Sequence, residues 1–216
     1  VEIRNRWHGD MLEMIRFVKA TIGEKLLIVN TSNNGDYVDA CDGKMEEGFV
    51  HPSWYAFDEF HDYIKWEKKI SDVENVCQKG KYILVHSGFE ELGSDKTFID
   101  SHPEIVHKML MYCFSSYLLA INGSKASFGF GNIWNLDGSG GYYSEFDLAK
   151  QLGVPIDGYY LFNSVYVRNF KNGKVLVNPT ASPYTVFLDQ NYKTLDGQTV
   201  SSVTLDDHMG VILLKT

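Results

Sequence analysis

The stretch Asp42-Gly43-Lys44-Met45-Glu46-Glu47-Gly48-Phe49 is predicted to form a short buried strand that ends in two adjacent carboxylates. Side chains alternate between the two faces of a strand, so only one of Glu46 and Glu47 can point to a given side. His51 and Trp54 follow shortly after. Carboxylates at the carboxyl end of a buried strand, with an imidazole and an indole in the next loop, are typical of an active site in an α/β fold. The pattern is equally compatible with ordinary charges at the edge of a sheet.

Short apolar runs alternate with amphipathic helices on both sides of this strand. Buried strands are predicted over residues 25–30, 41–47, 81–86 and 125–130, and helices over residues 6–21, 54–78, 103–122 and 144–152. Near-continuous apolar runs suit strands that are buried on both faces, as in a parallel sheet. Strands separated by helices imply right-handed parallel crossovers, and therefore an α/β fold.

From Gly158 onward the pattern changes to short β-rich runs separated by turn sequences such as Lys171-Asn172-Gly173 and Asp196-Gly197. The alternation of side chains within these runs predicts about five antiparallel strands with one buried face and one wet face. We therefore expect two domains, the first over residues 1–156 with the parallel sheet and the second, an antiparallel β domain, over residues 157–216.

Composition excludes some partners and leaves others open. The 216-residue chain has a net charge of −8 and no basic cluster, so no nucleic-acid partner is expected. No signal peptide and no apolar run of membrane-spanning length is present in the sequence, so no membrane partner is expected, and extracellular and cytoplasmic locations both stay open. Aromatic residues make up 14% of the chain. Such rings stack on neutral sugars, but they also build protein cores.

Other common chemistries lack their motifs. The seven histidines are scattered without metal-ligand spacing, and the three cysteines form no Cys-x-x-Cys pair, so we expect no metal and no cofactor. The Gly-rich segment 138–141 lacks the lysine of a phosphate-binding loop, and no Gly-x-Ser-x-Gly motif is present.

The carboxyl-terminal part of the chain contains VRNFKNGKVLVNPT at residues 167–180, followed by Leu195-Asp196-Gly197 and GVILL at residues 210–214. These segments resemble the small β-sandwich that closes many glycoside hydrolases built on a (β/α)8 barrel. The upstream part agrees, with a strand ending in Asn30, the stretch D-G-x-M-x-E-G-F at residues 42–49, and a strand ending in His86-Ser87-Gly88. The resemblance implies the C-terminal half of a TIM (β/α)8 barrel, strands five to eight, followed by a small antiparallel β-sandwich.

The resemblance also implies a function. Glycoside hydrolases cleave polysaccharides or oligosaccharides with two carboxyl groups, a proton donor and a nucleophile or base. In the families that this chain resembles, one of the pair lies on strand six, which corresponds to Glu47, with Glu46 as the second choice. Glu47 is therefore assigned the general acid/base role. The other carboxylate lies on strand four, which would precede Val1, so part of the active site is expected outside this chain.

Five further residues are candidates for binding the carbohydrate substrate: Asn30, His51, Trp54, His86 and Trp134. Asn30 could bond a sugar hydroxyl or cap its own loop. Trp54 could line the subsite or pack in the core at the start of its helix. Trp134 could stack on a sugar or fold back onto the β module.

A barrel of this class has eight strands, whereas the sequence predicts only four. Open parallel edges favour aggregation, so we expect a missing N-terminal barrel half or a second copy of the chain as a partner. Two alternatives stay open beside the glycosidase. One is a non-catalytic carbohydrate-binding or scaffold protein that retains a barrel remnant, and the other is an unrelated α/β enzyme.

Overall fold

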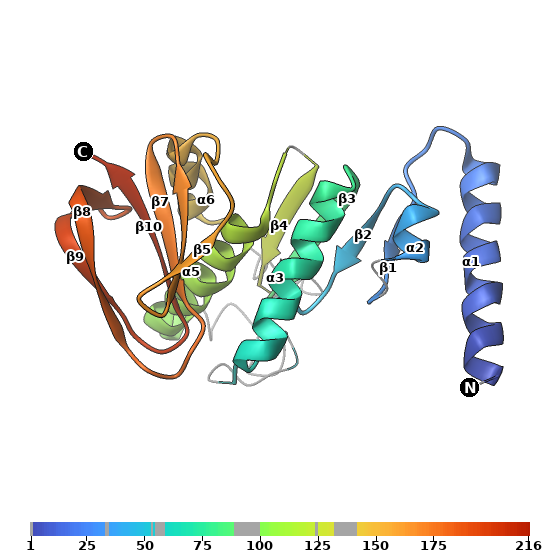
Figure 1. Ribbon diagram of the computed structural model, residues 1–216, viewed down its shortest axis with the longest axis horizontal. Helices are drawn as coiled ribbons and strands as arrows, with labels where there is room; N and C mark the ends of the chain where they lie inside the picture. The colour runs from blue at the N-terminus through green and yellow to red at the C-terminus, as the bar shows by residue number, and fades with distance from the viewer. Residues whose placement is uncertain are drawn as a thin grey trace.

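The computed structural model describes residues 2–32, 35–52, 54, 59–88, 100–123, 125–131 and 142–216, and its architecture is mixed α/β (Figure 1). Sheet A is parallel with the strand order β1-β2-β3-β4, and it consists of β1 (Ile28–Asn30), β2 (Gly43–Glu46), β3 (Tyr82–Ser87) and β4 (Ala126–Phe130). Sheet B is antiparallel with the strand order β5-β6-β7-β10-β8-β9, and it consists of β5 (Tyr160–Phe162), β6 (Val165–Phe170), β7 (Gly173–Asn178), β8 (Tyr184–Thr194), β9 (Thr199–Leu205) and β10 (Met209–Lys215).

The helices described are α1 (Glu2–Ile22), α2 (Asp36–Asp39), α3 (Tyr63–Gln78), α5 (Pro103–Ala120) and α6 (Ser144–Ala149), which continues into the single 3-10 turn η1 (Lys150–Leu152). Within the described residues, no helix combines the length and the apolar character that crossing a membrane requires.

One face of sheet A packs against helices. Ile83 and Val85 of β3 are buried on this face, and α3 contacts both β2 and β3. On β4, the ring of Phe128 stacks 5.5 Å from that of Phe114 on α5. Every second side chain of these strands is therefore covered by a helix. This burial explains why the apolar runs of the sequence form strands here.

The other face of sheet A, which we call the inner face, is partly open to solvent. The parallel register pairs Met45 of β2 with Leu84 of β3, and Leu84 with Ser127 of β4, so these three side chains share that face. Leu84 lies in the middle of its strand and is 40% exposed, and Ser127 is also exposed. Parallel sheets are normally covered on both faces, so this exposure is unusual.

Helix α5 lies between the two sheets (Figure 1) and contacts β4 on one side and β6, β7 and β10 on the other. Its residues from Met109 to Ala120 are all buried, as expected of a helix that is apolar on every side. One core cluster contains Val38 and Trp66 from the first part of the chain and Val177 and Ile212 from sheet B. It therefore crosses the expected boundary at residue 156, and the division into two domains stays a prediction.

Arg168 of β6 connects sheet B to the end of α5. Its Nη1 atom donates to the carbonyl oxygens of Leu118 at 3.1 Å, Leu119 at 2.9 Å and Ile121 at 2.5 Å. Its Nε atom donates to the carbonyl oxygen of Asp157 at 2.9 Å. The last carbonyls of a helix lack partners within the helix, so the guanidinium satisfies them.

Two expected elements differ from the structure. The helix expected from Trp54 begins at Tyr63, because Asp62 caps it by accepting a hydrogen bond of 2.8 Å from the backbone N–H of Lys65. The first of the β-rich runs expected after Gly158 is divided into β5 and β6 by a tight turn at Asn163 and Ser164, which have φ values of 49° and 66°. Sheet B therefore has one strand more than expected.

Candidate active site

The carboxyl ends of the parallel strands meet at one edge of sheet A, which we call the carboxyl edge. It carries Asn30 at the end of β1, Glu46 and Glu47 at the end of β2, and His86 near the end of β3. Gly131 follows the end of β4. In open α/β sheets and in barrels, ligands bind at this edge because the loops that follow the strands converge there.

A polar contact at the carboxyl edge joins Asn30 and Glu47. The register pairs Asn30 with Met45, so Asn30 faces the inner side, and Glu47, two residues after Met45, points the same way. The side-chain amide of Asn30 donates to Oε2 of Glu47 at 2.8 Å. Asn30 is exposed and Glu47 is half-buried, so the carboxylate is held in place and still reaches solvent.

Glu46 points to the opposite side, toward α3. Its carboxylate is buried, and it accepts hydrogen bonds from Lys44 at 2.5 Å and from Lys69 of α3. Lys44 itself is fully buried. A carboxylate that neutralises two ammonium groups inside the helix layer fits a structural role, because a buried charge must be paired. The sequence pattern did not identify either lysine as a partner, since the contact depends on how α3 packs on the sheet.

Gly48 makes the turn that follows Glu47. Its φ is +63°, which favours glycine, and a Cβ atom at this position would lie 2.7 Å from the indole of Trp54. Trp54 is half-exposed, with one part of its ring over Gly48. The core-packing role considered for Trp54 at the start of a helix does not apply, because α3 begins at Tyr63. The indole instead lies beside the turn that carries Glu47.

His51 and His86 are buried behind the carboxyl edge. The Nδ1 atom of His51 lies 2.7 Å from the carbonyl oxygen of Gly88, and Nε2 of His86 lies 2.9 Å from that of Gly131. The backbone N–H of Phe49 also donates to the carbonyl oxygen of His86 at 2.9 Å. The two imidazoles therefore fasten the loops after β2, β3 and β4 to one another. Through these contacts the two imidazoles hold the backbone of the carboxyl edge in position.

Gly88 allows this close approach of neighbouring strands. A Cβ atom at Gly88 would lie 2.2 Å from the carbonyl oxygen of Gly131, which no side chain tolerates. The backbone N–H of Gly131 donates to the carbonyl oxygen of Ser87 at 3.1 Å. The sequence alone gave no reason to single out Gly88, because the contact joins loops that are 43 residues apart.

Asp42 lies at the other end of β2. Its carboxylate accepts a hydrogen bond of 2.8 Å from the backbone N–H of Leu27 and pairs with Lys19 of α1 at 2.8 Å. The Lys19 ammonium is the main reason that the pKa of Asp42 is lowered. A strand of this length separates Asp42 from the carboxyl edge by about 13 Å. It therefore connects α1 to the sheet and takes no part in the edge.

His61, a residue that the sequence did not single out, is buried beside the edge. Burial is the largest cause that lowers its pKa from 6.5 to about 4, and the charges of Lys65 and Lys69 add to the effect. A hydrogen bond with the backbone of Gly48 acts in the opposite direction. At neutral pH the imidazole is uncharged, and it packs next to the turn after Glu47.

Trp134 lies outside the described residues. Among the residues that are described, no group of three or more histidine, cysteine or acidic side chains has the geometry to hold a metal ion.

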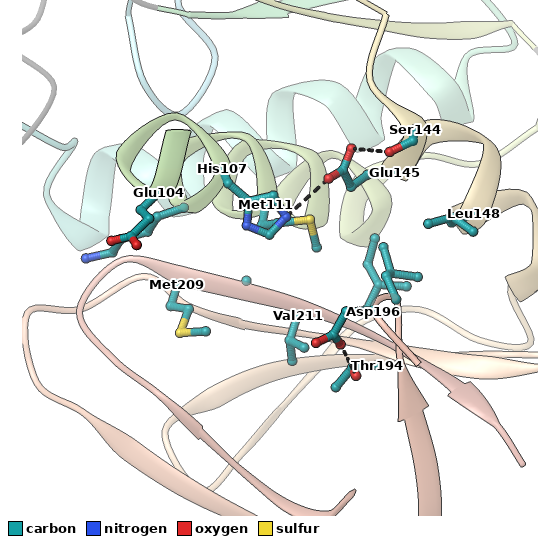
Figure 2. Close-up of a pocket in the computed structure, with 14 residues that line it drawn as sticks. Glu104, His107, Met111, Ser144, Glu145, Leu148, Thr194, Asp196, Met209 and Val211 are labelled. Carbon is teal, nitrogen blue, oxygen red and sulfur yellow. Dashed lines mark hydrogen bonds and ion pairs between the residues drawn. The ribbon is translucent and has the colours of Figure 1, made fainter. Parts of the chain in front are cut away.

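A separate cavity of about 580 Å³ lies between α5, α6 and sheet B (Figure 2). His107 of α5 points across it and pairs with Glu145 of α6 at 3.2 Å, while Asp196 bonds Thr194 on the sheet side. Met111 and Val211 contribute apolar walls. None of the predicted site residues lines this cavity. Of its charged groups, His107 pairs with Glu145, and Lys108 pairs with Asp207 at 3.0 Å.

The fold and the edge define the chain as an α/β protein whose parallel sheet presents an accessible, hydrogen-bonded carboxylate at its carboxyl edge. The chain belongs to a family described as hypothetical glycosyl hydrolase family 15 (GHL15), whose model matches residues 1–174. The match includes all of sheet A and the carboxyl edge and ends inside β7. It confirms the expected likeness to a glycoside-hydrolase-like family. No curated protein matches the chain.

Proposed function

We propose that this chain is part of a glycoside hydrolase and that Glu47 is its general acid/base. The observation that carries the proposal is the Asn30–Glu47 pair at the carboxyl edge, in a chain that belongs to a glycosyl-hydrolase-like family. Glu47 reaches solvent, and an amide fixes its orientation. A positioned carboxyl group that can exchange a proton with a glycosidic oxygen is the central requirement of the reaction.

Glu46 does not serve as the second carboxyl group in this proposal. It faces the helix layer, and the positive charges of Lys44 and Lys69 neutralise it there. Hydrolysis needs two carboxyl groups on opposite sides of the bond that is cleaved, roughly 5–10 Å apart. The partner of Glu47 is therefore supplied from outside the described residues.

We further propose that sheet A is half of a (β/α)8 barrel. Three observations support this arrangement. In the described part of the chain, β1 and β4 each have one neighbouring strand, so both edges of the sheet are open. The inner face exposes Leu84. Among the described elements, α3 and α5 pack on the face opposite to Leu84, as helices do in the outer ring of a barrel. Four more parallel strands would pair both edges, cover Leu84 and bring the second carboxylate to face Glu47.

The hydrolysis is tested with the native assembly that contains this chain. The assembly is incubated with neutral polysaccharides (xylan, galactomannan, hydroxyethylcellulose and soluble starch), and the release of new reducing ends is measured. We expect release from at least one of them, and the same assay with Glu47→Gln should show release that is slower by at least about a hundredfold. Equal release by wild type and Glu47→Gln would remove Glu47 from the mechanism.

The second candidate function is a carbohydrate-binding protein that does not cleave its ligand. One observation favours it: Glu47 is the single carboxylate that the described residues place on the inner side of the carboxyl edge. Native mass measurement of the purified particle separates the two functions. If a second polypeptide of half-barrel size or a longer chain is present, the hydrolase is supported. A particle of this chain alone, in one copy, would favour the binding protein.

A further inference from the structure

We propose that sheet B carries a second carbohydrate site, a groove that binds a neutral oligosaccharide and does not cleave it. The groove, which we call the β5–β8 groove, has a volume of about 440 Å³ and lies between β5, β6, β7 and the middle of β8. Its principal side chains are Tyr160, Phe162, Asn169, Lys174 and Asp189. This site goes beyond the proposed hydrolysis, because it shares no residue with the carboxyl edge.

The strand register places the groove on the face of sheet B that points away from α5. Tyr160 pairs with Val167, and Val167 pairs with Leu176, so these three side chains share one face. Val167 and Leu176 belong to a small core that is separate from the α5 core. Val186 and Tyr192 of β8 complete this small core. Strand β8 therefore folds over β6 and β7.

The open part of this face carries two exposed aromatic rings. Tyr160 is 42% exposed and Phe162 45%. Phe187 is 78% exposed and points to the other side of β8, because its neighbour Val186 faces the small core. Exposed rings gathered along one concave surface indicate a binding site. Flat rings of this kind stack against the C–H faces of sugars.

Polar groups line the same groove at hydrogen-bonding distances from one another. The side-chain amide of Asn169 lies 3.3 Å from the hydroxyl of Tyr160. The ammonium of Lys174 pairs with Asp189 at 2.6 Å and lies 4.8 Å from the centre of the Tyr192 ring. Sugar hydroxyls both donate and accept hydrogen bonds, and an amide, a phenol and an ion pair offer both functions.

The charge of the groove selects a neutral ligand. Lys174 and Asp189 cancel each other, and no other lining residue is charged. The chain as a whole has a net charge of −8, so an anionic ligand would be repelled. The groove volume lies within the usual range of small-molecule sites, about 300–1,000 Å³, whereas a stable protein partner needs a much larger contact. The combination of rings, hydrogen-bonding groups and zero charge fits a short stretch of a neutral glycan.

Affinity electrophoresis tests the proposal. The native assembly is run through gels that contain xylan, galactomannan, hydroxyethylcellulose or soluble starch, beside a gel without polysaccharide. Tyr160→Ala and Phe162→Ala remove exposed rings and should leave the fold intact. Leu161→Ala is the matched control, since Leu161 is 59% exposed on the same strand but pairs with Tyr166 on the opposite face. Glu47→Gln is the control for the carboxyl edge.

We expect retardation in at least one gel. The two groove variants should weaken binding by about tenfold or more, while Leu161→Ala and Glu47→Gln should bind as wild type does. The proposal is overturned if no gel retards the protein, if the groove variants bind like wild type, or if Glu47→Gln abolishes retardation. It is also overturned if Phe162→Ala changes the particle mass, because the rings would then join protein copies. Retardation without hydrolysis would refute the proposed function and leave this site standing.

Discussion

The side-chain amide of Asn30, at the end of β1, donates a hydrogen bond of 2.8 Å to Oε2 of Glu47, one residue beyond the end of β2. The bond crosses from one parallel strand to the next, and it exists because both side chains face the inner side of sheet A. It makes Asn30 a positioning residue for the proposed general acid/base.

An acidic residue at position 30 should change the pH dependence of hydrolysis. Asn30→Asp would place a second carboxylate against Glu47, and like charges at such a distance raise a carboxyl pKa by about one unit or more. A general acid works only while protonated, so the alkaline limb of the rate profile should move to higher pH. Asn30→Ala, which adds no charge, should move it less. Identical limbs for Asn30→Asp and wild type would show that Glu47 does not govern the profile.

Removing the charge of Glu46 should destabilise the protein. Glu46→Gln leaves the fully buried Lys44 without its carboxylate partner, and breaking a buried ion pair typically costs about 3–5 kcal/mol. The free energy of unfolding is measured by urea denaturation. Glu47→Gln is the neighbouring control and should unfold near the wild-type midpoint. The double variant Lys44→Met/Glu46→Leu, which removes both charges of the pair, should recover most of the lost stability. Equal stability of Glu46→Gln and wild type would contradict the structural role of Glu46.

The buried His61 should make stability depend on pH. Its pKa is lowered from 6.5 to about 4 in the folded state, so the unfolded chain binds the proton more readily between these values. Stability should be complete above about pH 6.5 and fall as the pH approaches 4, by up to about 3 kcal/mol. The comparison is between urea midpoints of wild type and His61→Gln at pH 7 and pH 4.5. The variant should lose less stability on acidification than wild type; an equal loss in both would assign the effect to other groups.

Arg168 should contribute strongly to the joint between α5 and sheet B. Arg168→Met removes the donor to the carbonyls of Leu118, Leu119 and Ile121 and leaves them buried. Hydrogen bonds to a charged donor are worth about 1.5–3 kcal/mol each, with incomplete additivity, so we expect a loss of about 3 kcal/mol in urea unfolding. Arg168→Lys should recover only part of it, because an ammonium cannot reach all three oxygens. Full recovery by lysine would indicate that charge alone matters.

The sequence predicted the parallel strands and the opposite orientations of Glu46 and Glu47 for a simple reason. Apolar runs between helices imply parallel crossovers, and the two-residue period of a strand separates Glu46 from Glu47. Both rules are local, and the structure follows them in β2.

Contacts between distant elements could not be predicted in the same way. Arg168 caps α5, and this contact depends on where a helix 47–50 residues away ends. Lys69 reaches Glu46 only once α3 is docked on the sheet. No local period encodes tertiary packing of this kind. The start of α3 is a different case: the helix was expected from Trp54, but the Asp62 cap, which is a local signal, starts it later.

The most direct test of the central claim is the rate of glycoside hydrolysis by the native assembly carrying Glu47→Gln, measured beside its thermal midpoint. The substitution keeps the shape of the side chain and its contact with Asn30 but removes the transferable proton. We predict a rate that is lower by about a hundredfold to ten-thousandfold, with an unchanged midpoint. An unchanged rate in the folded variant would contradict the assignment of Glu47 as the general acid/base.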